Sequence, residues 1–257
     1  MNRRTFLQLA TGSLSISLLP RGRAASSGSP KAGQIKAVAF DALTTFDPRN
    51  VDRVAEELFP SRGAQFANLW RTRQFEYSWL RVITGRFTDF WSITHDALQF
   101  TAAALKLELN DSQEEKLANA YLELQPYSDS VAAFRALHEK GIRLRFLTNF
   151  SPNMLQPIVA KAGLAPYIEP HLTTDLAHTY KPDPRAYQLG VDAFGFSKEE
   201  ILFAAFASWD ANGGKSFGYP TFWVNRWDVP ADSLGTEPDQ TGNTLLPLVE
   251  FVTARNL

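Results

Sequence analysis

The sequence predicts an α/β fold in which a Rossmann-like parallel sheet is flanked by helices. Four apolar runs have the pattern of strands buried on both faces, at residues 34–40, 142–148, 201–207 and 220–226. A shorter run at 167–174 supplies a fifth strand. Helical patterns lie between the runs, and this alternation of strands and helices is typical of a parallel sheet covered on both sides.

Two of the helices between the strands carry clear start and stop signals. Residues 129–141 have apolar side chains at helical spacing, and Gly141 provides the stop. Residues 151–163 begin with Ser151 as the N-cap and a proline at the first helical position, and they end at Gly163.

Residues 49–125 differ from the rest of the chain because they contain aromatic-rich helical patterns and no convincing strand. We therefore expect a helical cap subdomain at 49–125, inserted into a core made of residues 33–48 and 126–257. Such a cap covers the carboxyl end of the sheet, which is the edge where open α/β sheets bind their ligands.

The first 25 residues are not expected to belong to the fold. The twin arginine, Arg3 and Arg4, precedes Phe6, Leu7 and a short apolar run, and small residues follow where a signal peptidase would cut. Residues 1–25 thus resemble a Tat-type signal peptide, which predicts a periplasmic or secreted protein exported by the Tat pathway. The apolar run is too short to span a bilayer comfortably, so no membrane span is expected in the mature form.

Charge and cysteine content exclude several classes of function. The formal net charge is -1, so no basic surplus indicates a nucleic-acid partner. The chain has no cysteine, which excludes disulfides, thiolate catalysis and cysteine-ligated zinc.

Polar side chains follow the predicted strands at the points where these strands end. They are Asp41, Thr148, Asn149, Lys181 and Asp210. Each alone is weak evidence, since an aspartate after a strand is usually a turn residue or a helix cap. In a parallel sheet, however, all of them gather at one edge, where they supply the groups of a nucleophile site.

These motifs resemble those of the haloacid dehalogenase superfamily, and within it those of the type II L-2-haloacid dehalogenases. The matching stretches are FDALTTFD at Asp41, LTNFSP at Thr148 and Asn149, YKPDPRAYQLG at Lys181 and Tyr187, and ASWDANGG at Trp209 and Asp210. The stretch LWRTRQFEYSWL matches the dehalogenases' cap helix. It places Arg71 at the position of their substrate-contacting arginine, with Phe90 on a following cap segment.

The resemblance implies hydrolytic dehalogenation of small 2-haloacids with no cofactor and no metal. Asp41 would attack C2 and expel halide, and water would then hydrolyse the aspartyl ester. Lys181 would hold Asp41, Arg71 would bind the substrate carboxylate, and Asp210 would support the site. The substrate-binding residues implied are Leu43, Phe90, Thr148, Asn149, Tyr187 and Trp209. The resemblance also suggests a homodimer.

Several positions depart from the family patterns and keep three hypotheses open. Leu43 stands where superfamily phosphatases carry an acid and where dehalogenases usually have tyrosine, and Phe206 stands at the place of a magnesium ligand. Ala205 and Ala207 replace a serine and an asparagine of the dehalogenases. We therefore prefer a dehalogenase, keep an altered relative that binds a small carboxylate through Arg71, and rank a phosphatase last.

Overall fold

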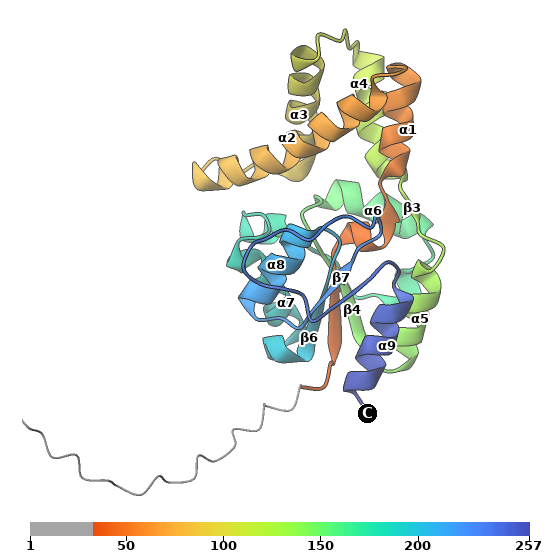
Figure 1. Cartoon of the computed structure of the whole chain (residues 1–257), viewed down its shortest axis with the longest axis vertical. Coiled ribbons are helices and arrows are strands. Elements are labelled where there is room, and N and C mark those ends of the chain that lie inside the picture. Colours follow the sequence, from red (N-terminus) through yellow and green to blue (C-terminus); the bar gives the residue numbers. More distant parts are fainter. Residues whose placement is uncertain (1–32) are drawn as a thin grey trace, which may run out of the picture. The chain divides into compact units, whose positions relative to one another are not determined.

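A six-stranded parallel sheet forms the centre of the structure. The structure is a computed structural model that describes residues 33–257, so the signal peptide predicted at 1–25 lies outside the described residues. The strand order is β5-β4-β1-β6-β7-β8, and every neighbouring pair is parallel (Figure 1). The strands are β1 (Ala37–Phe40), β4 (Arg143–Thr148), β5 (Leu172–Thr173), β6 (Ile201–Ala205), β7 (Thr221–Val224) and β8 (Gln240–Gly242). The predicted α/β fold with a parallel sheet is confirmed.

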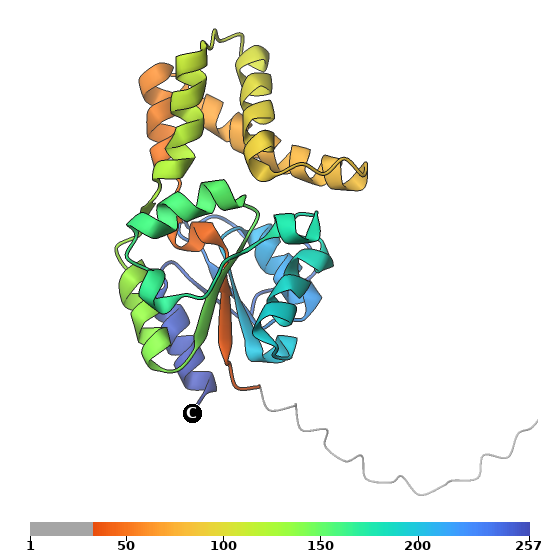
Figure 2. The same cartoon turned by 180° about the vertical axis from the view of Figure 1, so that it is seen from behind.

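Helices cover both faces of this sheet (Figure 2). They are α5 (Ser130–Glu139), α6 (Pro152–Lys161), α7 (Pro184–Phe194), α8 (Ser208–Phe217) and α9 (Leu246–Arg255). Side chains alternate between the two faces of strand β1. Val38 and Phe40 pack in one cluster with α5, α6 and α9, whereas Ala37 and Ala39 pack in another with α7 and α8. Burial on both faces explains why β1 is uninterruptedly apolar.

The segment between the first strand and α5 is helical, as the sequence predicts. Its elements are α1 (Arg49–Leu58), α2 (Gly63–Ile83), α3 (Phe90–Ala104), α4 (Asp111–Asn119) and the 3-10 helix η2 (Ala120–Glu123). A short antiparallel pair, β2 (Phe46–Asp47) and β3 (Gln125–Pro126), carries the chain from the sheet into these helices and back. The described residues form one compact unit, so the exact division into cap and core stays a prediction. None of the described helices is both long and apolar enough to cross a bilayer.

Hydrogen bonds fasten the cap helices to the core beside the sheet edge. The Trp79 indole N–H donates to the Lys181 carbonyl at 3.0 Å, and the Trp91 backbone N–H donates to the Ser151 hydroxyl at 2.8 Å. Ser151 occupies the predicted N-cap position of α6, but its side chain accepts no hydrogen bond from its own helix. The hydroxyl is used instead to hold the first turn of α3, so this polar group joins cap to core.

Candidate active site

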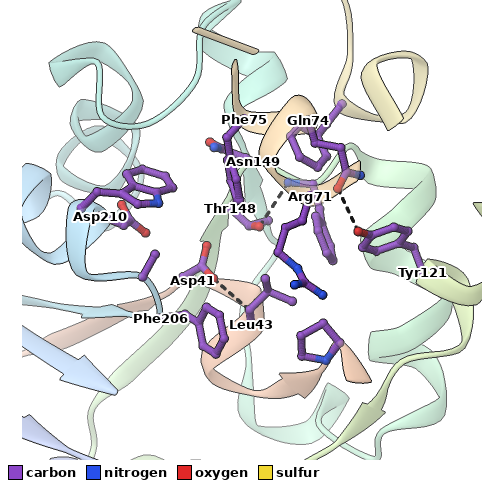
Figure 3. Close-up of a pocket in the computed structure, with 15 residues that line it drawn as sticks. Asp41, Leu43, Arg71, Gln74, Phe75, Tyr121, Thr148, Asn149, Phe206 and Asp210 are labelled. Carbon is purple, nitrogen blue, oxygen red and sulfur yellow. Dashed lines mark hydrogen bonds between the residues drawn. The ribbon is translucent and has the colours of Figure 1, made fainter. Parts of the chain in front are cut away.

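A small cavity, with a volume of about 40 Å³, lies where the cap helices meet the carboxyl ends of β1, β4 and β6 (Figure 3). Its lining residues are Asp41, Leu43, Pro48, Arg71, Gln74, Phe75, Phe90, Tyr121, Thr148, Asn149, Phe150, Phe206, Ala207, Trp209 and Asp210. Of the residues that the sequence assigns to the site, only Lys181 and Tyr187 are missing from this lining. Both lie directly behind it.

Asp41 is the first residue after β1, and both of its carboxylate oxygens are oriented. Its Oδ1 accepts a hydrogen bond from the Leu43 backbone N–H at 2.9 Å, which makes Asp41 the cap of a short 3-10 helix. Its Oδ2 accepts from Lys181 Nζ at 2.7 Å. The side chain is 14% exposed and faces the cavity. The Asp41 carboxylate therefore caps the turn through Oδ1, is held by Lys181 through Oδ2, and is a candidate nucleophile.

Lys181 is fully buried, and its ammonium bridges two carboxylates. The Nζ atom lies 2.7 Å from Asp41 Oδ2 and 2.6 Å from Asp210 Oδ2. Burial alone would lower the pKa of Lys181, but Asp210 and Asp41 outweigh it and raise the pKa above its ordinary value. The lysine backbone is fixed as well, because its N–H donates to Asn149 Oδ1 at 3.0 Å. A permanent cation thus holds the candidate nucleophile from behind.

Asp210 is the second carboxylate on the Lys181 ammonium. Burial raises the pKa of Asp210 to about 6, against the opposing pull of Lys181. The Tyr187 hydroxyl donates to Asp210 Oδ1 at 2.7 Å, and this bond favours the charged form. The position of Tyr187 differs from the predicted substrate contact, because the side chain is fully buried behind Asp210 and does not line the cavity. Tyr187 therefore holds the Asp210 carboxylate in place through this hydrogen bond.

Unpartnered donors face the same cavity from the end of β4. Asn149 is 4% exposed, and its Nδ2 has no hydrogen-bond partner among residues 33–257. Thr148 is also buried, and its Oγ1 accepts from the Phe150 backbone N–H at 3.2 Å, which leaves the hydroxyl proton for another acceptor. Buried donors are rarely left without an acceptor, so this edge suits a ligand that brings oxygen or halogen acceptors.

Arg71 enters the cavity from helix α2. Its side chain is 20% exposed, and its Nη2 donates to Asp52 Oδ1 at 2.7 Å. The guanidinium also lies 5.4 Å from the centroid of the Trp227 ring. The structure therefore brings the predicted arginine to the cavity, together with an acidic partner, Asp52, that the sequence does not indicate.

Seven cavity-lining residues are absent from the sequence-based site, namely Pro48, Gln74, Phe75, Tyr121, Phe150, Phe206 and Ala207. Gln74 and Phe75 lie three and four positions after Arg71, and this spacing puts them on the same helix face, so helical periodicity was an available signal. Tyr121 lies in η2 and its hydroxyl donates to Gln74 Oε1 at 2.9 Å. Nothing in its local sequence indicates that contact, because it depends on how η2 packs on α2.

Apolar side chains occupy the two positions at which superfamily phosphatases would carry an acid and a magnesium ligand. Leu43 and Phe206 both line it and offer no oxygen ligand, and the Phe206 ring packs edge-on against Trp227 at 5.0 Å between centroids. Ala207 forms the start of α8 without a side-chain cap. Within residues 33–257, no three His, Asp or Glu side chains gather in a way that could hold a metal ion. The donor set thus fits a carboxylate nucleophile better than magnesium-assisted phosphoryl transfer.

Comparison with known proteins points in the same direction. A family model described as haloacid dehalogenase-like hydrolase matches residues 35–218. The chain is 39% identical over 222 residues to an (S)-2-haloacid dehalogenase of Pseudomonas sp. (strain YL), covering 86% of this chain and 96% of that protein. It is 37% identical over 220 residues to haloacetate dehalogenase H-2 of Moraxella sp. (strain B), covering 85% and 98%.

A solved structure shares the same fold. It is the L-2-haloacid dehalogenase from Xanthobacter autotrophicus with chloropropionic acid covalently bound. The TM-score is 0.79 at 32% sequence identity, and the match covers 86% of this chain and 99% of that chain.

Proposed function

This chain belongs to the haloacid dehalogenase-like hydrolase family, and on that premise we propose that it hydrolyses the carbon–halogen bond of small 2-haloalkanoic acids. One observation carries the proposal. The Asp41 carboxylate faces a small and mainly apolar cavity, with the Lys181 ammonium 2.7 Å behind it. This is the arrangement that a carboxylate nucleophile needs, because it is desolvated on the side of attack and oriented on the other.

In the first step, Asp41 attacks C2 of the acid. A carboxylate oxygen of Asp41 forms a bond to C2, and the halogen leaves with the bonding electron pair as halide. The attack comes opposite the leaving group, so C2 is inverted and an aspartyl ester results. Phe75, Phe90 and Trp209 line the cavity and reduce the access of water to this step.

In the second step, water attacks the carbonyl carbon of that ester. The bond between this carbon and the ester oxygen breaks, and the ester oxygen takes up one proton of the water and leaves as the hydroxyl of the 2-hydroxy acid. The water oxygen remains in the Asp41 carboxylate, and the second proton of the water is released to solvent. Asp210 lines the cavity beside Lys181, and its pKa of about 6 suits a group that takes a proton from water near neutral pH. We assign it that role together with its hold on Lys181.

We assign substrate binding to the hydrogen-bond donors that line the cavity. Arg71 is assigned the substrate carboxylate, because its planar fork matches two oxygens. The unpartnered Asn149 Nδ2 and the Thr148 hydroxyl are assigned to the carboxylate and the departing halide. Each of these charge-assisted or buried contacts gains strength where water is excluded.

The direct test of the function is halide release from 2-chloropropionate and bromoacetate by the purified protein. We expect catalytic release of chloride or bromide at a rate that EDTA does not change, since none of the assigned roles needs a metal. Stoichiometric release that stops after one equivalent supports the altered relative instead, in which Ala205 and Ala207 fail to support hydrolysis of the ester. Magnesium-dependent phosphate release from a phosphate ester would contradict the proposal.

The pH dependence of turnover tests the assigned role of Asp210. We expect the rate to fall as pH drops through about 6, because protonated Asp210 neither accepts a proton nor balances Lys181. Protonation of Asp210 would not unfold the protein, so the expected fall in rate is not caused by acid unfolding. The folded pKa of Asp210 lies above the ordinary value of 3.8, so proton uptake between these values favours the folded state.

The variant Tyr187→Phe supplies the matched comparison. The hydroxyl of Tyr187 lowers the pKa of Asp210, so its removal should shift the acid limb of the pH–rate profile to higher pH. Circular dichroism at each pH separates this shift from unfolding. An acid limb that stays in place in Tyr187→Phe contradicts the assignment.

We further propose that the protein is exported to the periplasm or secreted, and that it forms a homodimer. Export through the Tat pathway rests on Arg3 and Arg4 and the apolar run after them, and a homodimer rests on the family resemblance alone.

A further inference from the structure

An aspartate of the cap, Asp52, is paired with the arginine that the proposed function assigns to the substrate carboxylate. Arg71 Nη2 donates to Asp52 Oδ1 at 2.7 Å. Among the cavity-lining residues of the described chain, Arg71 is the sole basic side chain. Building on the proposed function, we infer that Asp52 competes with the substrate carboxylate for Arg71 and so sets the affinity of the cavity for small carboxylic acids.

The two partners differ in how easily they can leave the pair. The Arg71 side chain is 20% exposed and packs near the Trp227 ring, whereas the Asp52 side chain is 36% exposed. Within residues 33–257, the Asp52 carboxylate accepts no hydrogen bond other than the one from Arg71. The Asp52 side chain can therefore rotate into solvent without leaving a buried polar group unpaired. Arg71 stays in the cavity, where it can bind another carboxylate.

A substrate carboxylate has two advantages over Asp52 as a partner for Arg71. Only one Asp52 oxygen receives a hydrogen bond, so the existing pair is monodentate. A free carboxylate can present both oxygens to the guanidinium, and Asn149, whose Nδ2 has no partner among the described residues, lines the same cavity. Figure 3 shows the Arg71 side chain extending toward Leu43, at the wall of the cavity. Exchange thus replaces one charge-assisted contact by a better one, and Asp52 returns when the product acid leaves.

The size of the effect follows from the exposure of the pair. Partly exposed ion pairs are weak, and a competitor of that strength raises an apparent dissociation constant about two- to fivefold. Asp52 is therefore a residue that tunes KM, and it takes no part in the bond-breaking steps.

The test measures affinity in the variant Asp52→Asn. Propionate, which has the carboxylate but no leaving group, is the binding probe in calorimetry with the full-length protein. We expect its Kd to fall about two- to fivefold, and the KM for 2-chloropropionate to fall by a similar factor with kcat nearly unchanged. Asp96→Asn is the matched control, because Asp96 pairs with Arg81 on the cap outside the cavity. It should change neither quantity.

The outcomes separate this inference from the proposed function. Unchanged or weaker propionate binding in Asp52→Asn overturns the inference, as does the absence of measurable binding in both proteins. Propionate binding that tightens in the variant, in a protein that releases no halide, supports the inference and contradicts the proposed reaction. Asp52→Glu keeps the charge, so a Kd close to that of the wild type in that variant separates the charge effect from a change of fold.

Discussion

Replacing Asp41 with asparagine is expected to abolish halide release, with a loss of at least about a thousandfold in turnover. The amide keeps the shape of the side chain and can still accept the Leu43 N–H, so the fold should remain. It lacks the nucleophilic oxygen, and its NH₂ group would face the Lys181 ammonium. Halide release under saturating 2-chloropropionate, with circular dichroism to confirm folding, is the measurement.

Asp47→Asn is the matched control for this variant. Asp47 lies six residues after Asp41, does not line the cavity, and its carboxylate accepts from the backbone and guanidinium of Arg49. We expect near-normal activity there. Equal activity losses in the two variants would show that the effect of Asp41→Asn comes from the turn and not from nucleophilic attack.

Replacing Lys181 with methionine is expected to have the second-largest effect, on stability as well as on activity. Methionine fills much of the same space but leaves Asp41 and Asp210 facing each other without their shared cation. Breaking a buried ion pair by removing one partner costs about 3–5 kcal/mol. Urea unfolding measures the stability, and halide release below the unfolding transition measures the activity.

Lys215→Met provides the comparison for this lysine. Lys215 lies on α8 and pairs with Asp239, but its side chain is 35% exposed, so the loss should be below about 1 kcal/mol. If Lys181→Met and Lys215→Met lowered the free energy of unfolding equally, the bridging role of Lys181 would be wrong.

The sequence predicts the central strands and the edge strand β5, but it misses the strand at the other edge of the sheet. Strands β1, β4, β6 and β7 lie within their predicted runs. β1 and β6 are apolar and buried along their whole length, as is typical of central parallel strands, whereas β4 alternates half-buried arginines with buried side chains in its first half. The edge strand β8 was not predicted. It has only three residues, it is mostly exposed, and its letters QTG carry no strand pattern. β8 is a strand only because it pairs with β7, and this pairing depends on the tertiary structure and not on the local sequence.

Some residues of the candidate site could likewise be predicted from the sequence, and others could not. Asp41 and Asn149 could be predicted because they directly follow β1 and β4, whose ends share one edge of the parallel sheet. Lys181 comes later in the loop after β5, and Asp210 lies in the first turn of α8, so the family motifs are the stronger signal for these two. The structure joins the four residues through hydrogen bonds. Asp52 could not be predicted, since it meets Arg71 only through the packing of α1 on α2. Helix contacts of this kind depend on crossing geometry that neither residue type nor spacing encodes locally.

In the proposed reaction, Asp41 becomes covalently bonded to C2 and is then regenerated by water. A single turnover in oxygen-18 water, with enzyme in excess over 2-chloropropionate, tests it most directly. We predict that the heavy oxygen appears in the peptide that contains Asp41, as read by mass spectrometry, while the 2-hydroxy acid carries ordinary oxygen. Heavy oxygen in the product and none in that peptide would mean that water attacks C2 directly, and would contradict nucleophilic attack by Asp41.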